Sequence, residues 1–406
     1  MRLINKSLMI LGTVAFCAVA HAGKIIPEGS ELEVKLKSSQ SYIHATFNID
    51  TNIGRTEEGY ASDSHAAWRV KNRMSALQDV LTQLRDAKVD SITLQETRKF
   101  VRRDGENVDS ITPIMDHLRS LGYDVLKQKY NPADPSDLVF CYITAWKPDY
   151  LEMVGQRTHY LTRTPDRATD HPDTTGLDAA AIKVIDQRIK ENNFGEYWER
   201  CLSITTLRDY RTDKRVHLIN THLGIGAEHR IEASRIISEV SKDILDKDLT
   251  AKIICSGDFN SFPDAKGPEQ MNAVARAGVL KEATSLLKLP NGRLTSSSFI
   301  AFPFDFGSKE QKLNLKNVIE ALPTPLRTQL INTLFGEVCN ALGGHLDRVF
   351  YAGFGGATSY LVPTPHFADG ESIDFSSESE VKAYIMRHVG SPAFASDHQP
   401  VLTLFE

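Results

Sequence analysis

An alternation of apolar, strand-like runs with amphipathic, helix-like runs is the feature that most constrains the fold of this chain. Met74, Leu77, Leu81 and Leu84 recur at helical spacing, and the run VDSITLQE that follows them is typical of a buried strand. The pattern predicts strands at residues 41–49, 89–96, 124–128, 137–146, 201–208, 216–222, 252–259 and 400–405, and helices at 74–84, 111–121 and 233–244. Strands that alternate with helices predict an α/β layered fold in which helices cover the sheets.

Three segments stand apart from this alternation. Residues 31–37, ELEVKLK, alternate charged and apolar side chains within a polar leader, residues 23–41, and predict an edge strand. Residues 155–199 are polar and carry few strand signals, and residues 263–343 contain two helical stretches. We interpret these last two segments as insertions near 155–199 and 263–343 of an otherwise layered core.

The first residues have the pattern of a targeting segment. The basic residues Arg2 and Lys6 precede an apolar run, residues 8–20, and a small-residue string that ends at Ala22. The run is too short to cross a bilayer as a stable helix. We therefore expect a signal peptide over residues 1–22 that is cleaved after Ala22, and a secreted or periplasmic protein without a stable membrane span.

The charge of the chain bears on its partners. The 406 residues include 47 basic and 52 acidic side chains, and without residues 1–22 the counts are 45 and 52, a net charge of −7. An acidic body predicts weak non-specific attraction to a polyanion such as nucleic acid, unless basic residues cluster locally. The string RKFVRR, residues 98–103, is such a cluster in the sequence.

Four cysteines follow the signal peptide, namely Cys141, Cys201, Cys255 and Cys339. They form no CxxC pair, which argues against a zinc knuckle or a thioredoxin-type site. Disulfides persist in exported proteins, and Cys141 and Cys201 could pair if their strands are neighbours. The alternative is that all four are free, buried, small apolar residues.

Polar side chains recur where the predicted strands end. An Asp or Asn beside a turn usually caps the local backbone. Here, however, the ends of several distant strands carry such residues, and strand ends in an α/β sheet are where ligands bind. The combination predicts one shared cleft formed by Asn48, Glu96, His222, Asp258, Asn260, Asp347, Asp397 and His398.

The strings around these residues are, in order, TFN, LQE, NTHLG, GDFNSFP, LDRVFYAG and SDHQPV. Together they resemble the motifs of the endonuclease/exonuclease/phosphatase superfamily, to which DNase I, AP endonucleases, inositol polyphosphate 5-phosphatases and neutral sphingomyelinases belong. The resemblance covers residues 42–406 with all motifs in family order. It implies one catalytic domain with the DNase I-like α/β fold, a four-layer sandwich of two packed mixed β-sheets with helices outside.

The resemblance also implies a metal-dependent hydrolase of phosphate esters. Cleavage of such an ester requires a hard cation, a base for the attacking water and stabilisation of the phosphate charge. Glu96 and Asn48 supply oxygen ligands of the kind that Mg²⁺ or Mn²⁺ prefers, and Asp397 is expected to complete this metal site.

The remaining residues take catalytic roles by the same resemblance. His398 is the general base or pairs with it, and Asp347 orients its ring and raises its basicity. Asp258 and Asn260 position the water and the phosphate, and His222 donates to a phosphate oxygen. Whether Asp258 or His398 takes the proton is left open by the sequence.

Two arginines are candidates for contact with the substrate phosphate. Arg98 follows Glu96 in QETR, a position where DNase-like members carry an arginine, and a solvated surface side chain is the alternative. Arg200 matches an arginine of related enzymes only across a long insertion.

Three interpretations of the substrate compete. QETR and GDFNSFP favour an exported nuclease, a monomer acting on DNA or RNA, and this is our preferred prediction. The string SDHQPV is close to that of the 5-phosphatases, so a phosphoinositide phosphatase or sphingomyelinase-like lipid phosphoesterase is the alternative. A non-catalytic binding module on the same fold is a minor alternative, because it predicts decay of catalytic positions and all of them are intact.

Overall fold

The computed structural model describes residues 26, 28–38, 41–49, 74, 77–101, 107–130, 140–161, 200–224, 227–260, 274, 278–288, 346–362, 398 and 400–406. The predicted signal peptide, residues 1–22, lies outside the described residues, as do Asp397, Cys339 and most of both predicted insertions. Among the described helices, none is both long and apolar enough to cross a membrane.

Two mixed sheets form the centre of the molecule. The first has the order β12 (Ala357–Leu361), β13 (Val401–Phe405), β1 (Tyr42–Asn48), β2 (Ser91–Val101), β5 (Phe140–Trp146) and β4 (Asp124–Lys129), with β3 (Asn107–Asp109) beside β2. The second has the order β10 (Lys281–Glu282), β11 (Asp347–Ala352), β9 (Lys252–Asp258), β8 (Lys214–His222), β7 (Cys201–Asp209) and β6 (Leu151–Tyr160). Each sheet contains one parallel pair, β1 with β2 and β8 with β9, among antiparallel neighbours.

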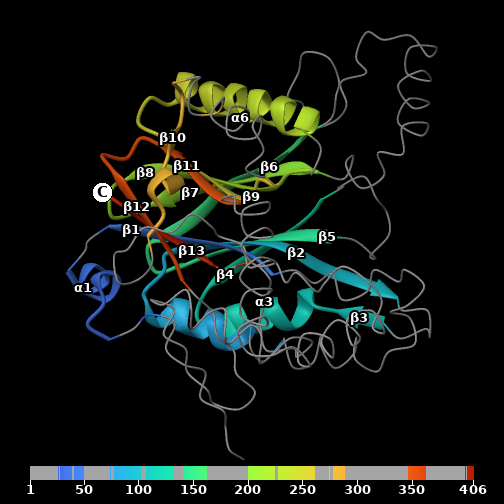
Figure 1. Cartoon of the computed structure of the whole chain (residues 1–406), viewed down its shortest axis with the longest axis vertical. Helices are drawn as coiled ribbons and strands as arrows, with labels where there is room; N and C mark the ends of the chain where they lie inside the picture. Colours follow the sequence, from blue (N-terminus) through green and yellow to red (C-terminus); the bar gives the residue numbers. More distant parts are fainter. Residues whose placement is uncertain are drawn as a thin grey trace, which may run out of the picture.

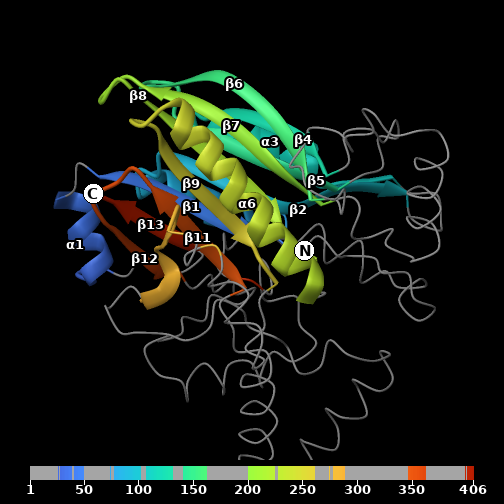
Figure 2. The same ribbon diagram turned by 90° about the horizontal axis from the view of Figure 1, so that it is seen from above.

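Helices cover the outer face of each sheet. Figure 1 shows α6 (Ala227–Lys247) above the second sheet and α3 (Ile111–Ser120) below the first, where residues 77–86 are also helical. The view from above in Figure 2 shows α6 lying across the strands of the second sheet. The molecule is therefore a four-layer sandwich of helix, sheet, sheet and helix, as the sequence predicts.

Three hydrophobic clusters hold these layers together. The first joins the lower helices to the first sheet and includes Leu84 and Leu118. The second joins α6 to the second sheet and includes Ile237. The third lies between the two sheets, where Val349 of one meets Phe405 of the other. Burial of apolar surface in every interlayer space accounts for the stacking.

The space between the sheets also contains a row of buried polar side chains. His44 and Asn48 of β1 face the second sheet, whereas the residues that alternate with them pack toward the helices. The Nε2 atom of His44 lies 2.9 Å from Oγ of Ser256, and the side-chain amide of Gln95 donates to Oδ1 of Asn220 at 2.8 Å. These hydrogen bonds join the two sheets and fix their register.

The prediction of an edge strand over residues 31–37 is wrong, because these residues form the helix α1 (Glu31–Ser38). Leu32 and Leu36 are buried one helical turn apart, whereas Val34 between them is 58% exposed. Ser30 begins the helix by accepting the backbone N–H of Glu33 at 3.2 Å. The Glu33 carboxylate in turn accepts the N–H of Gly29, so the turn is close to a capping box.

The predicted insertions overlap with the core at their described ends. The predicted insertion 155–199 begins inside β6, which pairs with β7 along its length, so residues 155–160 belong to the second sheet. Within 263–343, residues 281–282 form β10 and pair with β11. β6 and β10 are the edge strands of the second sheet and are partly exposed to water. Their polar side chains therefore lack the apolar pattern by which a strand is recognised in the sequence.

The described cysteines are buried and form no disulfide. Cys141 lies in β5 of the first sheet, and Cys201 and Cys255 lie in β7 and β9 of the second. The strands of Cys141 and Cys201 are therefore not neighbours in one sheet, which was the condition for the predicted pairing.

Candidate functional site

Strand ends from both sheets meet at one place. His222 and Asp258 are the last residues of the parallel strands β8 and β9 and pair with each other, and Asp347 begins β11 directly opposite Asp258. Asn48 ends β1 of the facing sheet, next to Glu96 of β2. Parallel strands bring their carboxyl ends to a common edge, so residues far apart in the sequence converge.

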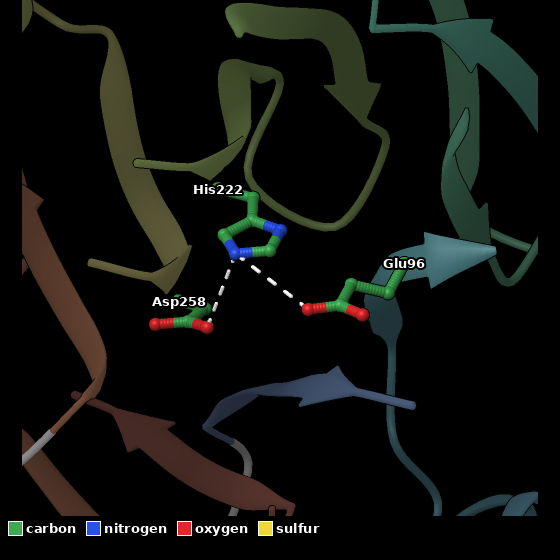
Figure 3. A group of neighbouring side chains, drawn as sticks. All are labelled: Glu96, His222 and Asp258. Atoms are coloured by element: carbon green, nitrogen blue, oxygen red, sulfur yellow. Dashed lines mark ion pairs between the residues drawn. The ribbon is translucent and has the colours of Figure 1, made fainter. Parts of the chain in front are cut away.

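Figure 3 shows the side chains of Glu96, His222 and Asp258 pointing toward one another from three strands. Nε2 of His222 lies 3.3 Å from Oδ2 of Asp258 and 3.7 Å from Oε1 of Glu96. His222 and Asp258 are buried, and Glu96 is half-buried. One ring nitrogen therefore faces two carboxylates in a space that is shielded from bulk water.

Asn48 connects the two carboxylates. Its Nδ2 atom donates to Oε1 of Glu96 at 3.0 Å and to Oδ2 of Asp258 at 2.9 Å, and it lies 3.4 Å from Nε2 of His398. An amide donor between two carboxylates reduces their mutual repulsion, which is large for like charges in a dry site.

His398 and Asp347 form a second pair beside Asp258. Nδ1 of His398 lies 2.8 Å from Oδ2 of Asp347, whose side chain is fully buried. Because a carboxylate accepts and cannot donate when ionised, this contact places the ring proton on Nδ1. The other nitrogen, Nε2, faces the Asn48 amide at 3.4 Å and lies 3.7 Å from Oδ2 of Asp258, so with the proton on Nδ1 it carries the lone pair of the ring.

Burial shifts the protonation of the central groups. It raises the pKa of the Asp258 carboxyl to about 6, even though the nearby His398 ring and the backbone N–H of Asn260 act in the opposite direction. Burial also lowers the pKa of His222 well below its usual value, and the positive charge of Arg200 lowers it further. His222 is therefore a neutral ring at pH 7.

Unusual backbone conformations place two of these residues. Glu96 has a φ of 61° at an irregularity in the β2–β5 pairing, and Asn260, two residues after the end of β9, has a φ of 48°. Both angles lie in the left-handed region, which non-glycine residues seldom adopt. The backbone N–H of Asn260 donates to Oδ1 of Asp258 at 2.7 Å, and its side chain donates to the backbone oxygen of Leu223 at 2.7 Å. Such strain is typical of functional sites.

The two candidate arginines lie on one stack of aromatic rings. Tyr130 stacks on Phe140 and on Tyr142, with centroid separations of 5.6 and 4.1 Å. The guanidinium carbon of Arg98 lies 4.6 Å from the Phe140 centroid, and that of Arg200 lies 5.2 Å from the Tyr130 centroid. Cation–π contacts of this kind hold guanidinium groups in place. Both arginines thus contact the aromatic stack whose central ring, Tyr130, lies beside His222.

The fold has known counterparts, although no protein-family model and no curated protein matches the sequence. The mannosyl-6-phosphatase Bt3783 of Bacteroides thetaiotaomicron superposes with a TM-score of 0.52 at 16% identity, over 90% of this chain and 100% of that chain. An endonuclease/exonuclease/phosphatase family protein from the same organism superposes with a TM-score of 0.51 at 15% identity, over 90% and 97% of the two chains. Truncated TDP2 of Caenorhabditis elegans gives a TM-score of 0.50 at 13% identity, over 90% and 98%.

The chain has the fold of the endonuclease/exonuclease/phosphatase proteins. The DNase I-like sandwich that the motifs predict is confirmed by these superpositions and by the two mixed sheets. At these identities the likeness concerns the fold, and the chemistry of the site has to be argued from its own residues.

Within this DNase I-like fold, most of the residues singled out from the sequence lie together. The structure brings together, in direct contact, Asn48, Glu96, His222, Asp258, Asn260, Asp347 and His398; Glu96 lies within β2 (Ser91–Val101), which continues beyond the end that the sequence predicts. Arg98 and Arg200 lie beside this group on the aromatic stack. Asp397, predicted as a metal ligand, lies outside the described residues.

Three of these residues could hold a metal ion. One ligand atom from each of Glu96, His222 and Asp258 lies within 4.8 Å of the others. The two carboxylates supply hard oxygen ligands of the kind that Mg²⁺ or Mn²⁺ prefers, whereas Nε2 of His222 could bind a cation only without its proton. Asn48 turns its amide nitrogen toward both carboxylates, so its predicted role as an oxygen ligand would require the amide to turn. The donor set fits a divalent cation bound chiefly by the carboxylates.

The sequence did not point to Tyr130, which the structure places in the middle of the site. It follows β4 directly, is buried, and continues the ladder by donating its backbone N–H to the oxygen of Phe140 at 2.9 Å. Its hydroxyl lies 2.9 Å from the backbone nitrogen of Glu96 and 3.1 Å from Nδ1 of His222. The sequence offers one hint, an aromatic residue between a strand and the turn-forming string NPADP.

Proposed function

We propose that this chain is an exported, Mg²⁺-dependent hydrolase of phosphate esters, with phosphodiesters of DNA or RNA as its first candidate substrates. The observation that carries the proposal is the pair formed by His398 and Asp347 next to Asp258. It combines a ring nitrogen that carries a lone pair with a carboxylate that orients the ring, which is the arrangement that general-base catalysis requires.

His398 and Asp258 activate the water in this proposal. Nε2 of His398 and Oδ2 of Asp258 are 3.7 Å apart, so a water between them can pass its proton to either. The water oxygen then bonds to phosphorus, and the ester oxygen departs with the electrons of the broken P–O bond. Asp347 stabilises the imidazolium that forms if His398 takes the proton.

His222 and the arginines contribute to binding the phosphate. A neutral ring with a proton on the nitrogen that faces Asp258 can donate to a phosphate oxygen on which charge develops. Arg98 and Arg200 supply positive charge from the aromatic stack on the flank.

A divalent cation, when bound, neutralises the phosphate and polarises its oxygens. Glu96 would hold it, with Asn48 beside it, and Asp397 is the further ligand predicted from the sequence. A cation bound there would also reduce the repulsion between the carboxylates of Glu96 and Asp258.

A sugar phosphate is the second candidate substrate. The mannosyl-6-phosphatase Bt3783 has the same fold and covers 90% of this chain. This likeness of fold is the observation that supports a small phosphate ester as the alternative to a nucleic acid.

One assay panel tests the function. The protein is incubated with plasmid DNA, RNA, a phosphoinositide, sphingomyelin and mannose 6-phosphate, each with Mg²⁺, with Mn²⁺ and with EDTA. The His398→Ala variant is measured in parallel, with His117→Ala of the distant helix α3 as the control. Cleavage of any of these that requires the cation and His398 supports the proposal, and cleavage that survives EDTA or the substitution contradicts it.

Export is tested separately. A signal peptide over residues 1–22 predicts that the protein recovered from the periplasm or medium begins at Gly23. A full-length chain retained in the cytoplasm of the producing cell would contradict this part of the proposal.

A further inference from the structure

The hydroxyl of Tyr130 is buried between one group that can only donate and one that can accept. The backbone N–H of Glu96 donates to it at 2.9 Å, and Nδ1 of His222 lies 3.1 Å from it. The Tyr130 side chain is 2% exposed, so its own proton has no access to bulk water. A buried hydroxyl proton without an acceptor destabilises the folded protein.

The only acceptor offered by these two partners is Nδ1 of His222. The Glu96 N–H cannot accept a proton, so the hydroxyl donates to Nδ1, which must then carry a lone pair. A neutral imidazole with a lone pair on Nδ1 carries its proton on Nε2. That nitrogen is the one that lies 3.3 Å from Asp258 and 3.7 Å from Glu96, both of them acceptors.

His398 has the opposite arrangement. Its Nδ1 donates to Asp347, and its Nε2 faces the Asn48 amide as an acceptor. Asp258 therefore lies between two imidazoles whose Nε2 atoms differ, one with a proton and one without. The chemistry of the site requires this difference, because a donor to phosphate and an acceptor for the water proton cannot be the same ring nitrogen.

We propose that Tyr130 is a positioning residue that fixes His222 as its Nε2–H tautomer and ties this ring to the backbone of Glu96. It does so without contact with the reacting atoms, through His222 on one side and Glu96 on the other. The proposal deepens the function proposed above and rests on it for its catalytic meaning, whereas the tautomer itself is a property of the protein alone.

Neighbouring rings hold Tyr130 in this position. Tyr142 stacks on it at 4.1 Å and accepts the backbone N–H of His222 at 3.2 Å, while its own hydroxyl donates to the backbone oxygen of Cys201 at 3.0 Å. Tyr142 thus touches the His222 main chain but not its ring nitrogens. This difference provides a matched pair of variants in which one hydroxyl is removed from either of two stacked, buried tyrosines.

The experiment is ¹⁵N NMR of the histidine side chains in the metal-free protein labelled with ¹⁵N-histidine. The signals of His222 are assigned as those that disappear in the His222→Gln variant. In the wild type and in Tyr142→Phe we expect Nε2 of His222 to be the protonated, pyrrole-like nitrogen. In Tyr130→Phe we expect this single pattern to be lost, with proton density on both nitrogens. A wild-type spectrum with the proton on Nδ1, or an unchanged pattern in Tyr130→Phe, would overturn the proposal.

The wild-type spectrum decides the tautomer even if Tyr130→Phe does not fold. Turnover of whichever substrate the assay panel identifies provides the second measurement. We expect Tyr130→Phe to lower kcat by about 10- to 100-fold, the usual range for a residue that acts through a catalytic group. Absence of any turnover in the wild type would contradict the proposed function but would leave the tautomer result intact, so the two failures can be told apart.

Discussion

The Asp347 side chain is fully buried, and its carboxylate accepts the proton of Nδ1 of His398. Because no bulk water reaches this contact, water cannot replace the carboxylate there. We expect His398→Ala and Asp347→Asn each to lower kcat, by about 10²- to 10⁴-fold. Because the two residues act as a unit, the double variant should lose no more than His398→Ala alone. The measurement is a double-mutant cycle: initial rates of the wild type, the two single variants and the double variant are compared on a substrate that the wild type cleaves.

The control for this cycle is His117→Ala, which removes a half-buried histidine that contacts Gln78 and Thr82 far from the site. Additive losses in the double variant would show that Asp347 acts on something other than the His398 ring.

His44 makes the stability of the protein sensitive to acid. Burial between the sheets lowers the pKa of His44 from 6.5 to about 3. As pH falls below 6.5, His44 is protonated in the unfolded chain but stays neutral in the folded protein, so the free energy of unfolding falls. We expect a loss of about 2 kcal/mol from this residue between pH 7.5 and pH 5.

Urea unfolding of the wild type and of His44→Gln at the two pH values checks this expectation. Gln carries no titrating group, so its stability should change less with pH even if it is lower at pH 7.5. An equal acid-induced loss in both proteins would show that His44 is not the source.

For single residues, the sequence predicts the polar side chains at the ends of strands. It does not predict a residue such as Tyr130, which affects the site only through its contact with His222. Asp258, Asp347 and His398 could be found because polar types at the ends of apolar runs are conspicuous. Tyr130 could not, since an aromatic residue after a strand is ordinary. Its meaning depends on the facing sheet, which brings His222 within 3.1 Å of its hydroxyl.

At the scale of elements, the close approach of β8 and β9 depends on Gly257. It has a φ of 145°, and a Cβ added there would lie 1.8 Å from the backbone oxygen of Thr221. We expect Gly257→Ala to destabilise the protein by at least about 2 kcal/mol, because it combines a strained backbone with a clash against main chain that cannot move away.

Thermal unfolding of Gly257→Ala measures the loss, with Gly155→Ala as the control. In β6 a Cβ at Gly155 would meet the Thr206 side chain only at 3.6 Å, an ordinary contact. If both variants lose the same stability, the tight approach of β8 and β9 is not the cause. A Cβ at residue 257 that pushes β8 away from β9 would also separate His222 from Asp258, which are paired at the ends of these strands.

The segment ELEVKLK illustrates why an element can be misread. Its apolar residues lie two apart, so they fit a strand, but Leu32 and Leu36 also lie one helical turn apart. The deciding signals are Ser30 and Glu33 at the start and ion pairs between residues four apart, such as Glu33 with Lys37. Start signals therefore have to be weighed together with periodicity.

Ser30 offers a direct test of this helix start. We expect Ser30→Ala to cost about 1 kcal/mol, because the N–H of Glu33 loses its acceptor. Ser38→Ala at the other end of α1 removes only exposed hydroxyl contacts to the backbone oxygens of Val34 and Lys35 and should be nearly neutral. Denaturant midpoints of the two variants make the comparison, and equal costs would argue against the cap.

At the scale of the whole molecule, the polar row between the sheets ends in the site. His44, Gln95 and Asn48 follow one another along this row, and the last of them touches both carboxylates. The outer clusters, which bind helices to sheets, are apolar. The order of the layers follows from such patterning and could be predicted. Which strand of one sheet faces which strand of the other could not be predicted, because no local sequence pattern encodes contacts between the sheets.

The carboxylates of Glu96 and Asp258 lie close together at the end of this row, so we expect the molecule to be less stable without a cation than with one. A cation that binds only the folded state stabilises it in proportion to the logarithm of its concentration over the dissociation constant. We expect Mg²⁺ or Mn²⁺ to raise Tm, and EDTA to abolish turnover while the fold persists, since three apolar clusters hold the layers without it.

Glu96→Gln separates the two effects. The substitution removes one of two negative charges that converge on His222, so we expect the metal-free variant to be at least as stable as the wild type. At the same time its Tm should no longer rise with the cation. Asp116→Asn, an exposed carboxylate paired with Arg119 on α3, should keep the wild-type rise. A cation-dependent rise that survives Glu96→Gln would place the stabilising ion elsewhere in the molecule.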